Sequence, residues 1–280
     1  VRAGDAWFVV DSGARTPAGP TPVPFASRDA ATQFADQYDG RVVGWETVVS
    51  RASDSQITTD PTDLVDARTA WADRTVGDAR ELRGRPTSMV VGEDAETVGA
   101  AIDQAPPNTT VVIPPGRYAV NLTVEKPITI RGAGNETVLD AGGTGSALTV
   151  RSPRAVVRSL RITGVGDVGI RRGDDDGGGW DERIRLIRGQ GDAGIRLADA
   201  TDSLIENVTV ETPTNGIVLL NSSGTAVRNV AIRGTDDWRD GFMGILAMYS
   251  RVVVEDSVVH GGRDGVYTHY SDGIVVRDNR

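Results

Sequence analysis

The pattern AGIRLADA (193–200) recurs as NGIVLLNS (215–222), MGILAMYS (243–250) and DGVYTHYS (264–271), and each copy is followed by a second short apolar stretch. With Gly169 of a weaker earlier copy, the marker glycines lie 25, 22, 28 and 21 residues apart. Such a period holds two or three short strands and no helix, which is the length of one coil of a parallel β-helix. The sequence therefore predicts a mainly β protein that folds as a right-handed parallel β-helix.

The chain is expected to have three parts. Residues 1–50 form a small α+β segment, whose last strand is predicted over RVVGWETVV (41–49). Residues 51–86 form a helical linker, with a helix expected from Pro61 to Arg83. Residues 87–280 form the β-helix, which we expect to be incomplete because the sequence stops within a repeat.

Alternation along the repeated strands predicts which side chains face inward. The isoleucines and the valine after the marker glycines are expected inside. The outer column is expected to contain Ala198, Leu220, Met248 and His269. Tyr249 and Tyr270 are expected to stack in the core, whereas His260 belongs to an outer column of alternating charge with Arg188, Glu211 and Arg233.

The two histidines raise the question of a metal site, because the chain has no cysteine. Met248 and His269 are expected on adjacent coils, and a thioether beside an imidazole is a suitable ligand set for copper. Met243 and His260 are candidates to complete the set. Alternatively, Met248 packs against Leu220 in an apolar outer stripe and His269 is only its neighbour.

Composition limits the classes of partner. The net charge is −9, and all but one of the 30 basic residues are arginine, which resembles the surface of a halophile's protein. Such a surface argues against nucleic acid as a partner. No apolar run approaches the roughly 20 residues that span a bilayer. The asparagines of five N-x-S/T sequons favour an exported chain: Asn108, Asn121, Asn135, Asn207 and Asn221.

Two stretches of the β-helical part resemble the NosD family, the maturation proteins of nitrous oxide reductase: GRYAVNLTVEKPITIRGAGNETVLDAGG (116–143) and GGRDGVYTHYSDGIVVRDN (261–279). The likeness covers about residues 87–280. Its more specific residues include Arg263, Asp264 and Tyr267, for which a docking role is expected; the first two are also a candidate turn-fixing pair.

Residues 1–50 resemble the C-terminal part of NosL, a copper chaperone, through WFVVDSG (7–13) and PVPFASRDAATQFADQYDGRVVGW (22–45). The family has a copper(I)-associated methionine in the intervening loop, and this chain has Ala18 at that place. The two resemblances together imply an extracytoplasmic, non-enzymatic accessory protein. It would work with an ABC-type ATPase and its membrane subunit in assembling the copper centre of nitrous oxide reductase.

Two other classes use the same fold. An extracellular polysaccharide lyase, hydrolase or epimerase would need carboxylates gathered on one outer face, to bind calcium or to act as general acid and base. The candidates lie in two loop insertions: Asp174, Asp175, Asp176 and Asp181, then Asp236, Asp237 and Asp240. Solvated loop acid is the alternative interpretation of these residues. A carbohydrate-binding or adhesion β-helix would need neither a metal nor a reaction.

Overall fold

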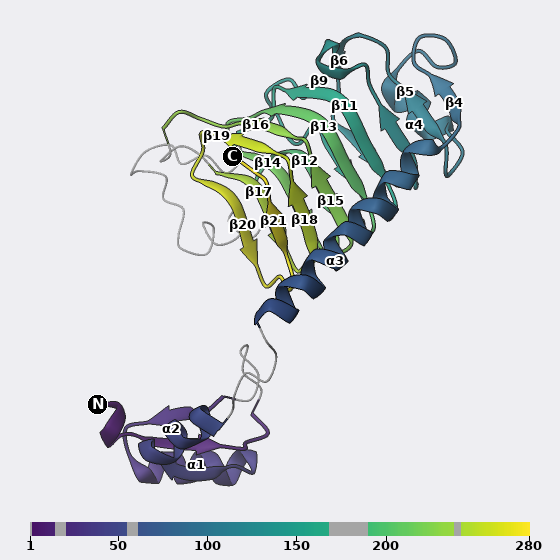
Figure 1. Cartoon of the computed structure of the whole chain (residues 1–280). Helices are drawn as coiled ribbons and strands as arrows, with labels where there is room; N and C mark the ends of the chain where they lie inside the picture. Colours follow the sequence, from purple (N-terminus) through teal and green to yellow (C-terminus); the bar gives the residue numbers. More distant parts are fainter. Residues whose placement is uncertain (1, 15–20, 55–60, 168–189, 238–241) are drawn as a thin grey trace. The chain divides into compact units, whose positions relative to one another are not determined.

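The structure is a computed structural model, and it describes residues 2–14, 21–54, 61–167, 190–237 and 242–280 (Figure 1). The chain divides into two compact units, Val1–Val65 and Asp66–Arg280. None of the helices described there is long and apolar enough to cross a membrane.

The first unit is a three-stranded antiparallel sheet with helices. The sheet has the order β2-β1-β3, with β1 at Trp7–Val10, β2 at Val23–Phe25 and β3 at Arg41–Gly44. The helices are η1 (Ala3–Asp5), α1 (Arg28–Tyr38) and α2 (Trp45–Asp54). Ser27 caps α1, because its side chain accepts a hydrogen bond from the Ala30 N–H at 3.3 Å.

The strand predicted over residues 41–49 is wrong in its second half. β3 ends at Gly44, and α2 begins at Trp45. The reason is the register: Gly44 pairs with Trp7, the first residue of β1, so β1 offers no partner to a longer strand. The acidic Glu46 and basic Arg51 lie at the ends of α2 that the helix dipole favours for each charge.

The second unit is a parallel β-helix, as the repeat predicted. One parallel sheet has the order β20-β17-β14-β12-β10-β7. Its strands are β7 (Leu122–Val124), β10 (Leu148–Val150), β12 (Ala193–Ala198), β14 (Asn215–Leu220), β17 (Met243–Met248) and β20 (Asp264–His269). From β7 to β20, each successive coil contributes one strand to this sheet.

The other sheet has the main order β21-β18-β15-β13-β11-β8-β5-β4. These strands are β4 (Thr87–Val90), β5 (Thr110–Val112), β8 (Thr129–Arg131), β11 (Val156–Thr163), β13 (Leu204–Glu211), β15 (Thr225–Arg228), β18 (Val252–Glu255) and β21 (Val275–Arg277). Further pairs join it through β6 (Gly116–Ala119), β9 (Thr137–Asp140), β16 (Ala231–Arg233) and β19 (Val258–His260), and η3 covers Gly134–Glu136.

The interior of the β-helix is filled by stacked aliphatic side chains. Ile195 pairs with Ile217, Ile217 with Ile245, and Ile245 with Val266, which is the predicted inward column. The three isoleucines are fully buried in one continuous core. The inward side chains of neighbouring strands therefore stack on one another from coil to coil.

The marker glycines in the described ranges are each the second residue of a strand in this sheet, at the corner where the chain enters it: Gly194, Gly216, Gly244 and Gly265. A Cβ added to Gly216 would come within 2.5 Å of the Gly244 carbonyl oxygen and 2.7 Å of Ile232 Cγ2. The corresponding atom on Gly244 would meet Val259 Cγ1. Glycine is therefore required at Gly216 and Gly244, because the next coil's backbone and an interior side chain occupy the space of a Cβ.

The other corners use residues with left-handed backbone. One such corner holds a residue with φ between 48° and 56° in each of four successive coils: Asn207, Asn229, Asp256 and Asp278. At a second corner Asp199 and Asn221 adopt this conformation, and Tyr249 and Tyr270 do so in the next two coils. Asparagine and aspartate tolerate this region, whereas a bulky residue does so only rarely.

The prediction that Tyr249 and Tyr270 are core residues is wrong. Their side chains are 53% and 58% exposed, although the rings do stack, with centroids 5.3 Å apart and planes at 6°. A left-handed residue ends the alternation of the strand, so the side chain that would have pointed inward points to solvent.

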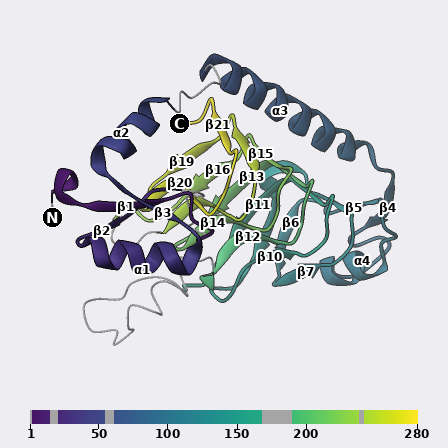
Figure 2. The same cartoon turned by 90° about the horizontal axis from the view of Figure 1, so that it is seen from below.

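Helix α3 (Pro61–Glu81) and the short η2 (Leu82–Gly84) lie across the strands of the second unit from Asp66 onward (Figures 1 and 2). Buried side chains one helical turn apart contact the outer face of β11, β13, β15 and β18. The contacting set consists of Ala72, Val76, Ala79 and Leu82 on the helix and Val156, Leu204, Ala226 and Val253 on the strands. The predicted linker helix therefore packs on the β-helix.

Helix α4 (Val98–Gln104) lies beside the first strands of the β-helix (Figure 2). Val98, Ala101 and Ile102 are buried in the main core. The lysine Nζ of Lys126 donates to the carbonyl oxygens that end this helix, those of Ile102, Asp103 and Ala105. The cation satisfies carbonyls that have no partner within the helix.

Candidate functional site

The predicted pair of Met248 and His269 is adjacent in the structure. The two residues are register partners at the ends of β17 and β20. Met248 is only 1% exposed and belongs to an outer apolar cluster that Leu246 also joins and against which Leu220 packs. The Met248 side chain therefore packs in an apolar outer stripe with Leu220, as one of the two interpretations of the sequence described. His269 is half-buried, and its buried Nδ1 has no hydrogen-bond partner among the residues that the structure describes.

Aromatic rings surround the imidazole. The ring centroid of His269 lies 4.1 Å from that of Tyr270 and 6.3 Å from that of Tyr267. Tyr270 in turn stacks on Tyr249. The end of β20 thus combines a buried imidazole nitrogen that has no hydrogen-bond partner in the described part of the chain with two exposed phenol rings.

His260 and Met243 lie away from this pair. His260 is exposed on β19 and pairs with Arg233, which pairs with Glu211, as the outer column predicted. Asp264–His269 forms the whole of β20, and five residue steps at about 3.3 Å place its ends roughly 17 Å apart. His260 precedes that strand, so it is remote from His269 along it. Met243 and Met248 are separated in the same way by β17.

Of the residues proposed for docking, Arg263 and Asp264 lie at the start of β20, and Tyr267 lies in its second half. Arg263 Nε donates to Asp264 Oδ2 at 3.0 Å, which agrees with a pair that fixes the turn. The Arg263 guanidinium also lies 5.3 Å from the ring centroid of Phe242 and donates a weak hydrogen bond to Met243 Sδ at 3.8 Å. Tyr267 packs against the same apolar cluster. Their docking role, like the metal role of the histidines and methionines, stays a prediction.

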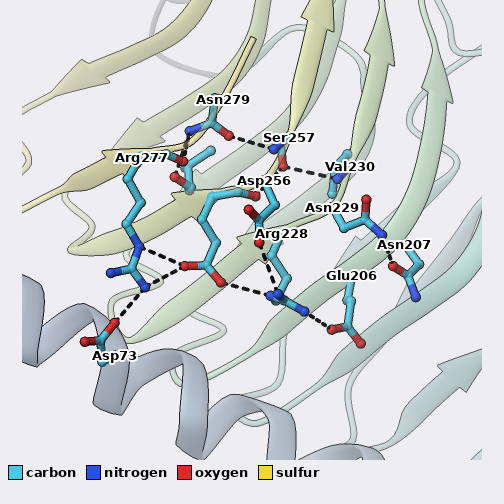
Figure 3. Close-up of polar contacts among 12 residues, drawn as sticks. Asp73, Glu206, Asn207, Arg228, Asn229, Val230, Asp256, Ser257, Arg277 and Asn279 are labelled. Carbon is cyan, nitrogen blue, oxygen red and sulfur yellow. Dashed lines mark hydrogen bonds and ion pairs between the residues drawn. The ribbon is translucent and has the colours of Figure 1, made fainter.

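A second polar constellation, which sequence reasoning missed, lies beside α3 (Figure 3). Arg228 donates to Glu206 Oε1 at 2.7 Å and to Glu255 Oε1 at 3.0 Å. Arg277 bridges Glu255 Oε2 at 2.7 Å and Asp73 Oδ1 of the helix at 2.8 Å. Glu206 and Glu255 are buried, so these charges are held in a solvent-poor layer between the strands and the helix. We call this set the charge ladder.

The charge ladder favours the ionised form of Glu206. Burial acts to raise the pKa of Glu206, but the hydrogen bond from Arg228 and the charges of Arg83 and Arg228 outweigh it, so the pKa lies below its ordinary value. The sequence signal was present: Arg158, Glu206, Arg228, Glu255 and Arg277 each directly precede the residue at the left-handed corner. Only the register shows that they form one column.

The carboxylates of the enzyme alternative are only partly placed. Asp236 and Asp237 are exposed, whereas Asp174, Asp175, Asp176, Asp181 and Asp240 lie outside the described residues, as do Ala18, Gly169 and Arg188. Within the described ranges, no three His, Cys, Asp or Glu side chains gather to hold a metal ion.

Comparisons with known proteins match the two units separately. Residues 1–53 match the family model NosL, and residues 177–280 match the model described as a right handed beta helix region. The comparison with curated proteins finds no match.

Solved structures share the β-helix. The catalytic domain of a GH87 alpha-1,3-glucanase in complex with nigerose is 17% identical with a TM-score of 0.49, covering 69% of this chain and 33% of that one. A pectin methylesterase in complex with hexasaccharide VII is 17% identical with a TM-score of 0.42, covering 67% of each chain. The alginate lyase from Paenibacillus sp. str. FPU-7 is 17% identical with a TM-score of 0.41, covering 65% of this chain and 72% of that one. This chain spans about a third of the glucanase structure's length.

The expectation of a non-enzymatic protein is corrected by this comparison. The solved structures with a similar β-helix include a glucanase, a pectin methylesterase and an alginate lyase, which are enzymes. At 17% identity the likeness shows the fold alone, so it assigns no reaction or substrate to this chain.

Proposed function

We propose that this chain is an extracytoplasmic accessory protein, of the NosD type in its β-helical unit, for assembling the copper centre of nitrous oxide reductase. Its partners in this role are the reductase, an ABC-type ATPase and the membrane subunit of that transporter. The observation that carries the proposal is the match of residues 1–53 to NosL on the same chain as a right-handed β-helix.

Copper enters this proposal as cargo. A thioether and an imidazole are soft ligands that suit copper(I), and Met248 and His269 provide them from register-paired positions. The buried Nδ1 of His269, without a hydrogen-bond partner in the described part of the chain, fits a nitrogen reserved for a metal. Two ligands leave coordination positions open for a donor or an acceptor protein.

A competition titration with a copper(I) chelator under anaerobic conditions tests the site. Met248→Leu and His269→Gln should each weaken binding by tenfold or more, about 1.4 kcal/mol. His260→Gln and Met89→Leu are matched controls, since they remove the other imidazole and a thioether remote from His269. Equal affinity in all five proteins would remove this pair from copper handling.

The pathway itself is tested in the source organism. Deleting the gene should yield nitrous oxide reductase that is folded but depleted in copper and inactive, and complementation should restore both. A fully copper-loaded reductase in the deletion strain would contradict the proposed function, whatever the titration shows.

A further inference from the structure

The column of the charge ladder continues into the two preceding coils, and there the alternation of acid and base stops. From Glu206 to Arg277 the column alternates acid and base: Glu206, Arg228, Glu255 and Arg277. On the other side of Glu206 the register partner is Arg158, and the partner of Arg158 is Arg131. Two guanidinium groups of like charge therefore stand on adjacent strands, about 4.8 Å apart at the backbone.

In the described part of the chain, the guanidinium groups of these two arginines have no hydrogen-bond acceptor. Among the described residues, the side chains of Arg131 and Arg158 make no hydrogen bond and no ion pair, and the Nε atom of each is buried without a partner. Glu206 does not serve them, because its oxygens accept from Arg228 at 2.7 Å and from Arg83 at 3.3 Å. Buried guanidinium donors without an acceptor are unfavourable, so the pair is arranged for something else.

The local charge balance indicates the sign of the missing group. Arg83, Arg131 and Arg158 have one carboxylate beside them, that of Glu206, and Arg228 shares it, so positive charge is in excess here. Burial lowers the pKa of Arg158, and repulsion from Arg83 and Arg131 lowers it further, although Glu206 opposes this. All three side chains are half-buried rather than sealed, so a small solute can reach them.

We propose that Arg131 and Arg158, with Arg83 beside them, form a binding site for a doubly charged oxyanion such as sulfate or phosphate. Two guanidinium forks on parallel strands can each donate two N–H groups to one tetrahedral anion. The anion would continue the alternation of the charge ladder and balance its excess charge. The site lies on the sheet that α3 covers, opposite in chain order to the Arg277 end of the ladder, and is independent of Met248 and His269.

Thermal unfolding and calorimetric titration of the whole chain test the site. Sulfate and phosphate should raise Tm in a saturable way, beyond chloride and acetate at the same ionic strength. In Arg158→Gln the apparent affinity for sulfate should fall by about tenfold or more, because charge-assisted hydrogen bonds are lost. Arg233→Gln removes an exposed guanidinium from a different column and should leave the affinity unchanged.

Stability without sulfate or phosphate separates an anion site from a structural role. Arg158→Gln should then unfold at the same Tm as the parent or higher, because it relieves repulsion from Arg83 and Arg131 and removes no hydrogen bond. A fall of several degrees in Tm would mean that Arg158 is a structural residue and would overturn the proposal. So would equal responses to sulfate and chloride, or an undiminished sulfate response in the double variant Arg131→Gln, Arg158→Gln.

Discussion

Arg228 and Glu255 are register partners on neighbouring coils, and Arg228 Nε donates to Glu255 Oε1 at 3.0 Å. The same guanidinium reaches back one coil to Glu206, while Glu255 reaches forward to Arg277. Asp73 of helix α3 forms an ion pair with Arg277, and Arg83 of η2 forms one with Glu206. Each coil is thus tied to the next by charge as well as by its core, and the helix is tied to several coils at once.

Removing one buried member should destabilise the whole second unit. Glu206→Gln leaves Arg83 without its carboxylate and removes one of the three that Arg228 contacts, and breaking a buried pair in this way costs about 3 to 5 kcal/mol of unfolding free energy. Urea denaturation measures it. The control is Glu211→Gln, which breaks the exposed pair with Arg161 and should cost less than about 1 kcal/mol. Similar losses of unfolding free energy in both variants would mean that the charge ladder stabilises the unit no more than an exposed ion pair does.

Acid should weaken the second unit through Glu206. Its pKa is lower in the folded protein than in the unfolded chain, so the ionised form contributes stability above the unfolded pKa of about 4.3. That contribution is lost as the pH falls through the lower, folded value. Asp140 acts in the same direction, because the Gly142 N–H and then Arg117 lower its pKa. Tm measured from pH 6 to pH 3 should fall more steeply in the parent than in Glu206→Gln; parallel curves would rule out this residue as the cause.

Much of the β-helix was predictable because its period and alternation are physical requirements of stacking. The spacing of Gly194, Gly216, Gly244 and Gly265 fixed the coil length, and alternation from them placed Ile195, Ile217 and Ile245 in the core correctly. The adjacency of Met248 and His269 follows from the same register. These features depend on neighbours of known offset in the chain.

The features that escaped depend on corners and on distant segments. Alternation carried through residues 249 and 270 put two tyrosines in the core, although left-handed backbone turns them outward. The charge ladder escaped because Arg83 and Asp73 join it from a helix more than a hundred residues away in sequence. One charged residue per coil is typical of an exposed strand position. The buried charge ladder can be recognised only when the strand register and the helix packed over it are known.

The corner glycines offer a matched pair of substitutions. Gly216→Ala places a Cβ 2.5 Å from the Gly244 carbonyl oxygen and 2.7 Å from Ile232, and such overpacking costs about 1 to 3 kcal/mol. Gly265→Ala, at the same position of the repeat in the last described coil, meets nothing within 4 Å and should change stability by less than about 0.5 kcal/mol. Urea midpoints compare the two. Equal effects would show that the glycine column is not selected by lack of space.

Substitutions at Tyr249 distinguish an exposed corner residue from a core residue, because the two placements predict different losses of stability. If it were a core residue, replacing its ring by a small side chain would cost about 3 to 5 kcal/mol. At an exposed corner the loss is mainly the stack on Tyr270, about 0.5 to 1.5 kcal/mol, and asparagine recovers part of it because it tolerates φ of 50° better than tyrosine does. Tyr249→Asn should therefore cost less than about 1.5 kcal/mol, and Tyr249→Ala should cost more than Tyr249→Asn, since alanine gains no local hydrogen bond at positive φ. The order of the urea midpoints checks this, and a large loss in both variants would return the ring to the core.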